Sequence, residues 1–227
     1  MTARVGVVVF PGTNCELDVV WALERLGGEA QLLWHGDASV HGVDAVVVPG
    51  GFAHGDYLRT GAIARFSPVM EAVGEFAAGG GPVVGICNGF QVLTESGLLP
   101  GALQKNRGLA FLCQDAALRV ETSRSVLTAT VTPGRVLRIP INHFEGNYVC
   151  DQDTLRRLHD EDRVVVRYVD NPNGSLDDIA GIANEQGNVV GLMPHPERAS
   201  DPLLGSADGV VLLESLLASA ASAVAAH

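Results

Sequence analysis

The residue best placed to do chemistry is Cys87, in the segment Val83-Val84-Gly85-Ile86-Cys87-Asn88-Gly89-Phe90-Gln91. An apolar run enters a Gly-x-Cys-x-Gly turn and a helical pattern follows, which is the order of a nucleophile elbow with Cys in place of Ser. Such a turn strains its central residue and lifts the side chain out of the sheet. The helix N-terminus then favours a thiolate. A buried core cysteine is the alternative, but the flanking glycines favour a nucleophile.

A thiolate that attacks a carbonyl carbon needs a proton-transfer partner, and His195 has the most suggestive context of the seven histidines. It lies in Met193-Pro194-His195-Pro196-Glu197-Arg198, where the prolines disfavour a helix and extend the chain. Residues i and i+2 of an extended segment point the same way, so Glu197 is expected to hold one imidazole nitrogen. An incidental pair on a surface loop is the alternative interpretation.

A third element is the apolar run Val46-Val47-Val48 followed by Pro49-Gly50-Gly51. Ligands of an open parallel sheet bind beyond the carboxyl ends of its strands. The amides at this Gly-Gly tip, together with that of Asn88, are therefore candidates for an oxyanion hole. An ordinary Pro-Gly turn is the alternative.

These residues require a sheet to position them, and the first half of the chain alternates Val-rich runs with helical patterns, as βαβ units do. The second half instead indicates strands joined by turns, among them 126–131 and 136–141, and a hairpin formed by 179–183 and 188–193. No linker or internal repeat divides the sequence. We therefore expect one α/β domain, residues 1–227, with an open, mostly parallel sheet and extra antiparallel strands in its second half.

Composition excludes several classes of protein. Apolar residues are 47% of the 227 and charged residues 18%, which excludes intrinsic disorder. The net charge of −11 disfavours nucleic acids and acidic membranes as partners. The four cysteines form no CxxC pair, so no metal site is expected, and no apolar run reaches the roughly 18 residues of a membrane span. We expect a cytoplasmic protein with reduced thiols.

Together, the three elements resemble class I (triad) glutamine amidotransferases. Within that family the sequence is similar to the glutaminase subunits of purine biosynthesis, whose ammonia goes to a synthetase that converts formylglycinamide ribonucleotide to formylglycinamidine ribonucleotide with ATP. The resemblance rests on blocks spread over nearly the whole chain, namely 10–16, 50–59, 85–91, 171–175, 179–182 and 191–198. It implies a three-layer, flavodoxin-like fold.

Carried over to this sequence, the resemblance makes Cys87 the nucleophile, His195 the general base and acid, and Glu197 its orienting carboxylate. It places the oxyanion-hole amides on Gly51 and Asn88, and the remaining glutamine-binding positions are Gly50 and Gln91. L-Glutamine, a separate synthetase subunit and a small bridging subunit are the implied partners. The chain has no Walker A sequence, so ATP and Mg²⁺ are assigned to the synthetase and no cofactor to this subunit.

Several positions and functions stay open. The segment Asn142-His143-Phe144-Glu145-Gly146 departs from the His-Gly-Glu-Gly loop of the family, and Cys15 is interpreted as structural. The loops 52–59 and 171–175 are either solvated turns or functional segments. The alternatives to the implied function are a glutaminase for another synthetase, such as that of guanylate or anthranilate, a cysteine hydrolase or peptidase, and a non-catalytic binding module.

Overall fold

The computed structural model describes residues 2–225, and its centre is a nine-stranded sheet of order β2-β1-β3-β4-β11-β10-β9-β6-β7. A separate pair, β5 with β8, lies outside this sheet. The strands are β1 (Arg4–Val9), β2 (Glu29–Trp34), β3 (Ala45–Val48), β4 (Val83–Ile86), β5 (Ala102–Gln104), β6 (Leu112–Val120), β7 (Val136–His143), β8 (Asn147–Val149), β9 (Val164–Tyr168), β10 (Ile179–Ala183) and β11 (Val189–Leu192). The α-helices are α1 (Glu16–Arg25), α2 (Pro68–Ala78), α3 (Asn88–Glu95), α4 (Gln152–Asp160) and α5 (Val210–Ala225).

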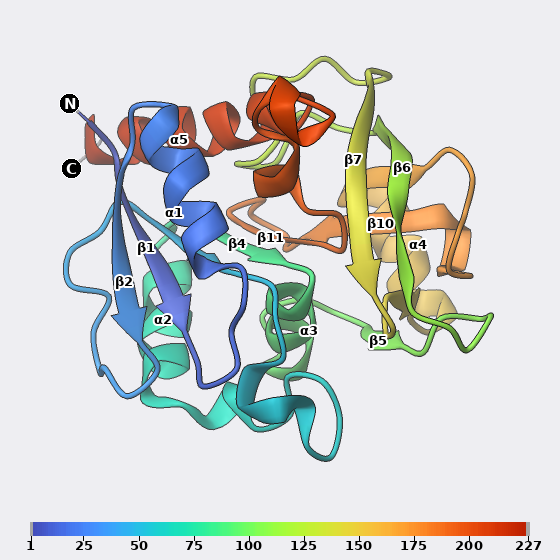
Figure 1. The fold of residues 1–227 in the computed structure, drawn as a ribbon, viewed down its shortest axis with the longest axis horizontal. Coiled ribbons are helices and arrows are strands. Elements are labelled where there is room, and N and C mark those ends of the chain that lie inside the picture. Colours follow the sequence, from blue (N-terminus) through green and yellow to red (C-terminus); the bar gives the residue numbers. More distant parts are fainter. Residues whose placement is uncertain (1, 226–227) are drawn as a thin grey trace.

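Five strands, β2, β1, β3, β4 and β11, run parallel to one another. Every residue of β3, β4 and β11 is buried, as expected for central strands that are covered on both faces. Helices α1 and α5 lie on one side of these strands, and α2 and α3 lie on the other (Figure 1). The predicted three-layer α/β architecture is confirmed, and the carboxyl ends of β3 and β4 lie side by side at one edge.

The second half of the chain continues the same sheet with antiparallel pairs, β11 with β10, β10 with β9, β9 with β6 and β6 with β7. The hairpin of β10 and β11 agrees with the sequence analysis. The strand expected at 126–131 is wrong, because this segment forms turns: Thr128 N donates to Ser125 O, and Val131 N to Thr128 O. Leu127 and Val131 are nevertheless buried, so the apolar residues of this segment reflect the packing of its turns into the core and not a strand.

Helix α3 approaches strand β3 so closely that only glycine fits at position 89. A β-carbon there would lie 1.8 Å from the Val48 carbonyl oxygen, and backbone cannot move aside as a side chain can. The close contact fixes the first turn of α3, and with it the residue just before the helix, against the end of β3.

We expect Gly89→Ala to lower the free energy of unfolding by about 3 kcal/mol or more, because overpacking displaces α3 from the sheet. Gly74→Ala is the matched control: it also lies inside a helix, α2, but its β-carbon would meet no atom within 4 Å. This control is expected to raise stability by about 0.5–1 kcal/mol. Urea unfolding of both variants checks the prediction, and equal effects would contradict it.

Among the described residues, no helix combines the length and apolar character needed to cross a membrane.

Candidate active site

Cys87 occupies the turn between β4 and α3 and has the backbone conformation of a nucleophile elbow. Its φ is 51° and its ψ is −105°, a strained combination for a residue other than glycine. Its amide donates to Leu192 O at 2.8 Å, which ties the turn to the end of β11. A β-carbon on Gly85 would lie 2.7 Å from the backbone of Gly89, so the turn needs both glycines. The predicted strand-to-helix turn is present.

His195 and Glu197 lie just beyond the end of β11 and form a buried pair. The imidazole Nδ1 is 2.6 Å from Glu197 Oε1, and the two residues are each 1% exposed. The amide of His195 donates to Pro140 O in β7 at 2.9 Å, which fixes the segment across the sheet. Glu197 reaches the ring from a 3₁₀ turn, Pro196–Ala199, and not from the fully extended segment that the two prolines predicted.

A cavity of about 260 Å³ brings Cys87 and His195 together at the carboxyl ends of the parallel strands. Cys87 Sγ lies 3.6 Å from Asn142 O, at the end of β7. The cavity is lined by Asn14, Cys15, Gly51, Phe52, Asp56, Thr60, Cys87, Gln91, Phe111, Asn142, His143, Phe144, Glu145, His195 and Arg198. Its volume suits a small substrate.

The charge distribution favours a protonated His195. Burial opposes protonation, but the negative charges of Glu197 and of a Cys87 thiolate outweigh it and raise the pKa of His195 well above its usual range. A cysteine and an imidazolium that share one cavity can divide the work of catalysis. The thiolate attacks a carbonyl carbon, and the imidazolium protonates the leaving group.

Gly50 lies where the nucleophile, the histidine and the N-terminal loop meet. A β-carbon on Gly50 would be 2.8 Å from His195 Cε1, 3.1 Å from Cys15 Sγ and 3.5 Å from Cys87 Cβ. Its carbonyl oxygen accepts from the amides of Asn14 and Cys15, both at 3.2 Å. Position 50 therefore excludes any side chain.

Gly51, the next residue, lines the cavity. It has φ 144°, and a β-carbon there would lie 2.6 Å from Asn14 N. The Gly-Gly tip expected from the sequence thus lies beside Cys87, with Gly51 exposed to the cavity.

Asn88 and Gln91 brace the cavity wall with their side chains. Asn88 Oδ1 accepts from Ala53 N at 3.0 Å, and its amide nitrogen donates to Gln91 Oε1 at 2.8 Å and to Asp56 Oδ1 at 3.2 Å. Gln91 in turn donates to the carbonyl oxygen of Glu145. The side chain of Asn88 is therefore committed to the wall, which leaves its backbone amide, at the first position of α3, as the oxyanion-hole candidate.

Burial raises the pKa of Asp56, which lines the cavity, and the nearby Glu145 adds to this effect. Asp56 belongs to the loop 52–59, whose role the sequence left undecided. Thr60 and Phe111 were not expected in the site, because they come from segments without a motif of their own.

His143, whose role the sequence left open, lines the same cavity and is 3% exposed. Asn106 orients it. The amide nitrogen of Asn106 donates to Ala110 O and to His143 O, so its Oδ1 is the acceptor for His143 Nδ1 at 3.1 Å. This network assigns the proton to Nδ1. Among the described residues, the buried Nε2 has no partner. Burial, with the nearby His195 as a second cause, lowers the pKa of His143 to about 4, so the ring is neutral near neutral pH.

This lowered pKa predicts a loss of stability in acid. Below pH 6.5 the unfolded chain binds a proton at His143 that the folded chain binds only near pH 4, so unfolding becomes easier over that window. The free energy of unfolding should fall by up to about 3 kcal/mol from this group. Urea unfolding of the wild type and His143→Gln at pH 7 and pH 4 checks it: the variant should lose less stability than the wild type. An equal loss in both would contradict the prediction, and His41→Gln, at an exposed histidine, is the control.

Cys15 also lies in the cavity, although the sequence analysis interpreted it only as a structural residue of the loop before α1. It is 3% exposed, and its sulfur accepts from Arg198 Nη2 at 3.2 Å. The same guanidinium donates to Asp18 Oδ2 at 3.1 Å. Cys15 and Arg198 therefore form one wall of the cavity, beside His195.

The two loops whose roles the sequence left undecided differ in their relation to the site. Loop 171–175 packs beneath it, because Asn173 is fully buried and donates to Gly146 O at 2.8 Å. Loop 52–59 forms the outer wall: Phe52 and Asp56 line the cavity, while Leu58 is 90% exposed. The first loop is a support for the segment that carries Glu145, and the second borders the cavity mouth.

Comparison with known proteins agrees with this geometry. Residues 2–208 match the CobB/CobQ-like glutamine amidotransferase domain, and the chain belongs to this family of glutamine amidotransferases.

The chain is 60% identical over 217 residues to phosphoribosylformylglycinamidine synthase subunit PurQ of Rubrobacter xylanophilus, with 96% of this chain and 99% of that protein covered. It is 58% identical over 214 residues to the subunit of the same name from Parasynechococcus marenigrum, with 94% and 99% covered. A chain in the structure of PurLQS from Thermotoga maritima superposes with a TM-score of 0.89 at 42% identity, and the match covers 96% of this chain and 99% of that one.

Proposed function

We propose that this chain is the glutaminase subunit of phosphoribosylformylglycinamidine synthase, hydrolysing L-glutamine to glutamate and ammonia. One observation carries the proposal: a cysteine on a strained elbow shares a small cavity with a buried His–Glu pair. That set can form and hydrolyse a thioester. Identity of 60% over nearly the full length to a subunit of that synthase supports the choice of enzyme.

In the proposed reaction, the Cys87 thiolate attacks the carboxamide carbon of glutamine. His195, held by Glu197, gives its proton to the departing ammonia, and a glutamyl thioester remains on Cys87. The same imidazole, now neutral, takes a proton from water, which hydrolyses the thioester to glutamate. Glu197 fixes the ring and stabilises the imidazolium.

The oxyanion of each tetrahedral intermediate is assigned to the backbone amides of Gly51 and Asn88. Gly51 follows the end of β3 and Asn88 begins α3, so the two amides flank Cys87 from neighbouring elements. The positive end of the α3 dipole points at the same place. Gly50 keeps the space above Cys87 free of side chains, and Gln91 holds the wall against which glutamine lies.

The site that uses the ammonia belongs to another chain of the complex. We assign ATP, Mg²⁺ and formylglycinamide ribonucleotide to a synthetase subunit, a small bridging subunit to the same cytoplasmic complex, and no cofactor to this chain. The name of the Thermotoga maritima assembly, PurLQS, indicates a complex of more than one subunit in that organism.

Reconstitution tests this proposal. The chain, mixed with the synthetase and small subunits of its own organism, should form formylglycinamidine ribonucleotide from glutamine, ATP and formylglycinamide ribonucleotide. Guanylate and anthranilate synthetases should gain no glutamine-dependent activity from it, and peptides should release no product. Product formation with one of those synthetases, or peptide hydrolysis, would favour the corresponding alternative.

A further inference from the structure

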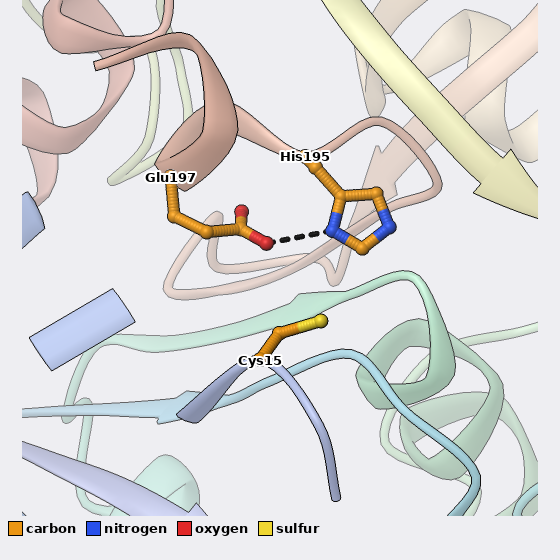
Figure 2. Close-up of side chains that lie close together, drawn as sticks. All are labelled: Cys15, His195 and Glu197. Atoms are coloured by element: carbon orange, nitrogen blue, oxygen red, sulfur yellow. Dashed lines mark hydrogen bonds and ion pairs between the residues drawn. The ribbon is translucent and has the colours of Figure 1, made fainter. Parts of the chain in front are cut away.

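Cys15 forms a compact cluster with His195 and Glu197, although the three residues come from opposite ends of the chain. One donor atom from each, the sulfur, a ring nitrogen and a carboxylate oxygen, lies within 4.8 Å of the others. All three residues are buried, at 3%, 1% and 1% exposure. Figure 2 shows the His195–Glu197 pair on one segment and the Cys15 sulfur reaching toward the imidazole from the facing segment.

Two donor atoms of this cluster lack a partner among the described residues. His195 uses Nδ1 and Glu197 uses Oε1 for their mutual hydrogen bond, while His195 Nε2 and Glu197 Oε2 are buried and unpaired. Buried polar atoms are rarely left unsatisfied. The proposed reaction assigns proton transfer to Nε2, but it gives no role to Oε2 or to the sulfur of Cys15.

The donor set matches one class of ligand. A thiolate, an imidazole and a carboxylate are the ligands of Zn²⁺, and a site with three protein ligands leaves a fourth position open. The soft sulfur disfavours Mg²⁺ and Ca²⁺, which prefer oxygen. Zinc–ligand bonds of about 2.0–2.3 Å set donor atoms about 3.3–3.7 Å apart. Donor pairs near the 4.8 Å limit must therefore approach by about 1 Å, and the 2.6 Å hydrogen bond between His195 Nδ1 and Glu197 Oε1 must open if Nδ1 is the ligand.

We propose that Cys15, His195 and Glu197 form an inhibitory binding site for Zn²⁺. Cys15 and His195 line the cavity, so the cation enters where the substrate does and keeps its fourth position toward Cys87. The sequence predicted no metal site because its cysteines form no CxxC pair; here the fold assembles the ligands from residues 15, 195 and 197.

Two positive charges oppose a cation here: the His195 imidazolium, whose proton Zn²⁺ has to displace, and Arg198, whose Nη2 lies 3.2 Å from Cys15 Sγ. Its side chain is 33% exposed and also bonds Asp18 Oδ2, which is 46% exposed. It can therefore keep the Asp18 contact while its other nitrogen turns from the sulfur to solvent. Zinc ligands bind in their deprotonated forms, so ligation releases protons, that of the His195 imidazolium among them, and zinc affinity should rise with pH.

The expected inhibition of glutaminase activity rests on the proposed function, whereas the binding of Zn²⁺ does not. A zinc ion bound to the imidazole removes the acid and base of the glutaminase reaction. Glutamine-dependent synthesis should stop, while synthesis from added ammonia continues, because the ammonia-using site lies on another subunit.

The binding test uses the isolated chain with Co²⁺ as a spectroscopic probe and Zn²⁺ in competition with a chromophoric chelator. The wild type should bind one Zn²⁺, and Co²⁺ should give a thiolate-to-metal charge-transfer band. Cys15→Ser should lose this band and weaken Zn²⁺ binding at least about 10-fold. Cys87→Ala should keep the band, as should Cys113→Ala, which removes an exposed thiol. A band that survives in Cys15→Ser and disappears in Cys87→Ala would overturn the site.

The activity test uses the reconstituted complex with Zn²⁺ buffered by a chelator. The Zn²⁺ concentration for half-inhibition of each variant's own glutamine-dependent rate should rise at least about 10-fold in Cys15→Ser relative to Cys113→Ala. Ammonia-dependent synthesis is the control for zinc acting on the synthetase. Equal zinc sensitivity of the two variants contradicts the proposal, even if both are active glutaminases. Should Cys15→Ser not fold, Glu197→Gln replaces it in the Co²⁺ titration and should weaken binding likewise, and full binding by that variant overturns the site.

Discussion

Cys87→Ala is expected to reduce glutamine-dependent synthesis by the reconstituted complex at least about 10⁴-fold, while synthesis from added ammonia stays within a factor of two of the wild type. The thiolate is the only group in the proposed reaction that bonds to the substrate carbon, so no neighbour replaces it. Ammonia bypasses the glutaminase site altogether. Cys87→Ser should behave in the same way, because the hydroxyl of serine is a far weaker nucleophile than a thiolate. Parallel assays with glutamine and with ammonium chloride give the two rates.

The control for this prediction is Cys150→Ala, which removes a half-buried thiol that does not line the cavity. It should retain both rates. If Cys87→Ala kept glutamine-dependent activity, the nucleophile would have to be another residue, and Cys15, which lines the same cavity, would be the candidate. If it lost both rates, the variant would have failed to assemble with the synthetase, which size-exclusion chromatography of the complex detects.

The central part of the fold could be predicted because its signals are local. Strands β3, β4 and β11 are short Val-rich runs, and the Gly-x-Cys-x-Gly turn carries its own conformational requirement. The antiparallel half was harder to predict. The turns at 126–131 bury Leu127 and Val131, and strand β6 buries apolar residues as well, so burial alone does not separate them; what separates them is pairing with distant chain segments.

The residues of the candidate site also differ in how far local sequence signals could predict them. Cys87, His195 and Glu197 stand in short motifs, so their types and spacing predicted the pair that the structure places 2.6 Å apart. Cys15, Asp56 and Asn106 could not be placed, since their positions depend on loops that only the sheet order brings together. The tautomer of His143, for example, is set by Asn106, which lies 37 residues away along the chain.

Glu197→Gln is expected to reduce the glutaminase rate by about 10³–10⁴-fold, although the side chain keeps its size. The wild-type carboxylate accepts from His195 Nδ1 at 2.6 Å in a site almost without solvent. A glutamine amide can instead donate to Nδ1, which moves the ring proton to Nε2 and leaves no lone pair facing Cys87. Loss of the negative charge also removes a cause of the raised pKa of His195.

The pH profile separates this positioning role from a merely structural one. His195 must be protonated to release ammonia, and its raised pKa keeps it so well above pH 6.5 in the wild type. Without the charge of Glu197, that proton is lost at lower pH, so the alkaline limb of the rate profile should move toward acid. Glu197→Asp retains the charge and should shift the limb less, even if its shorter side chain lowers the rate. A variant that is slow but has the wild-type pH profile would show that Glu197 packs against the site without setting the charge of His195.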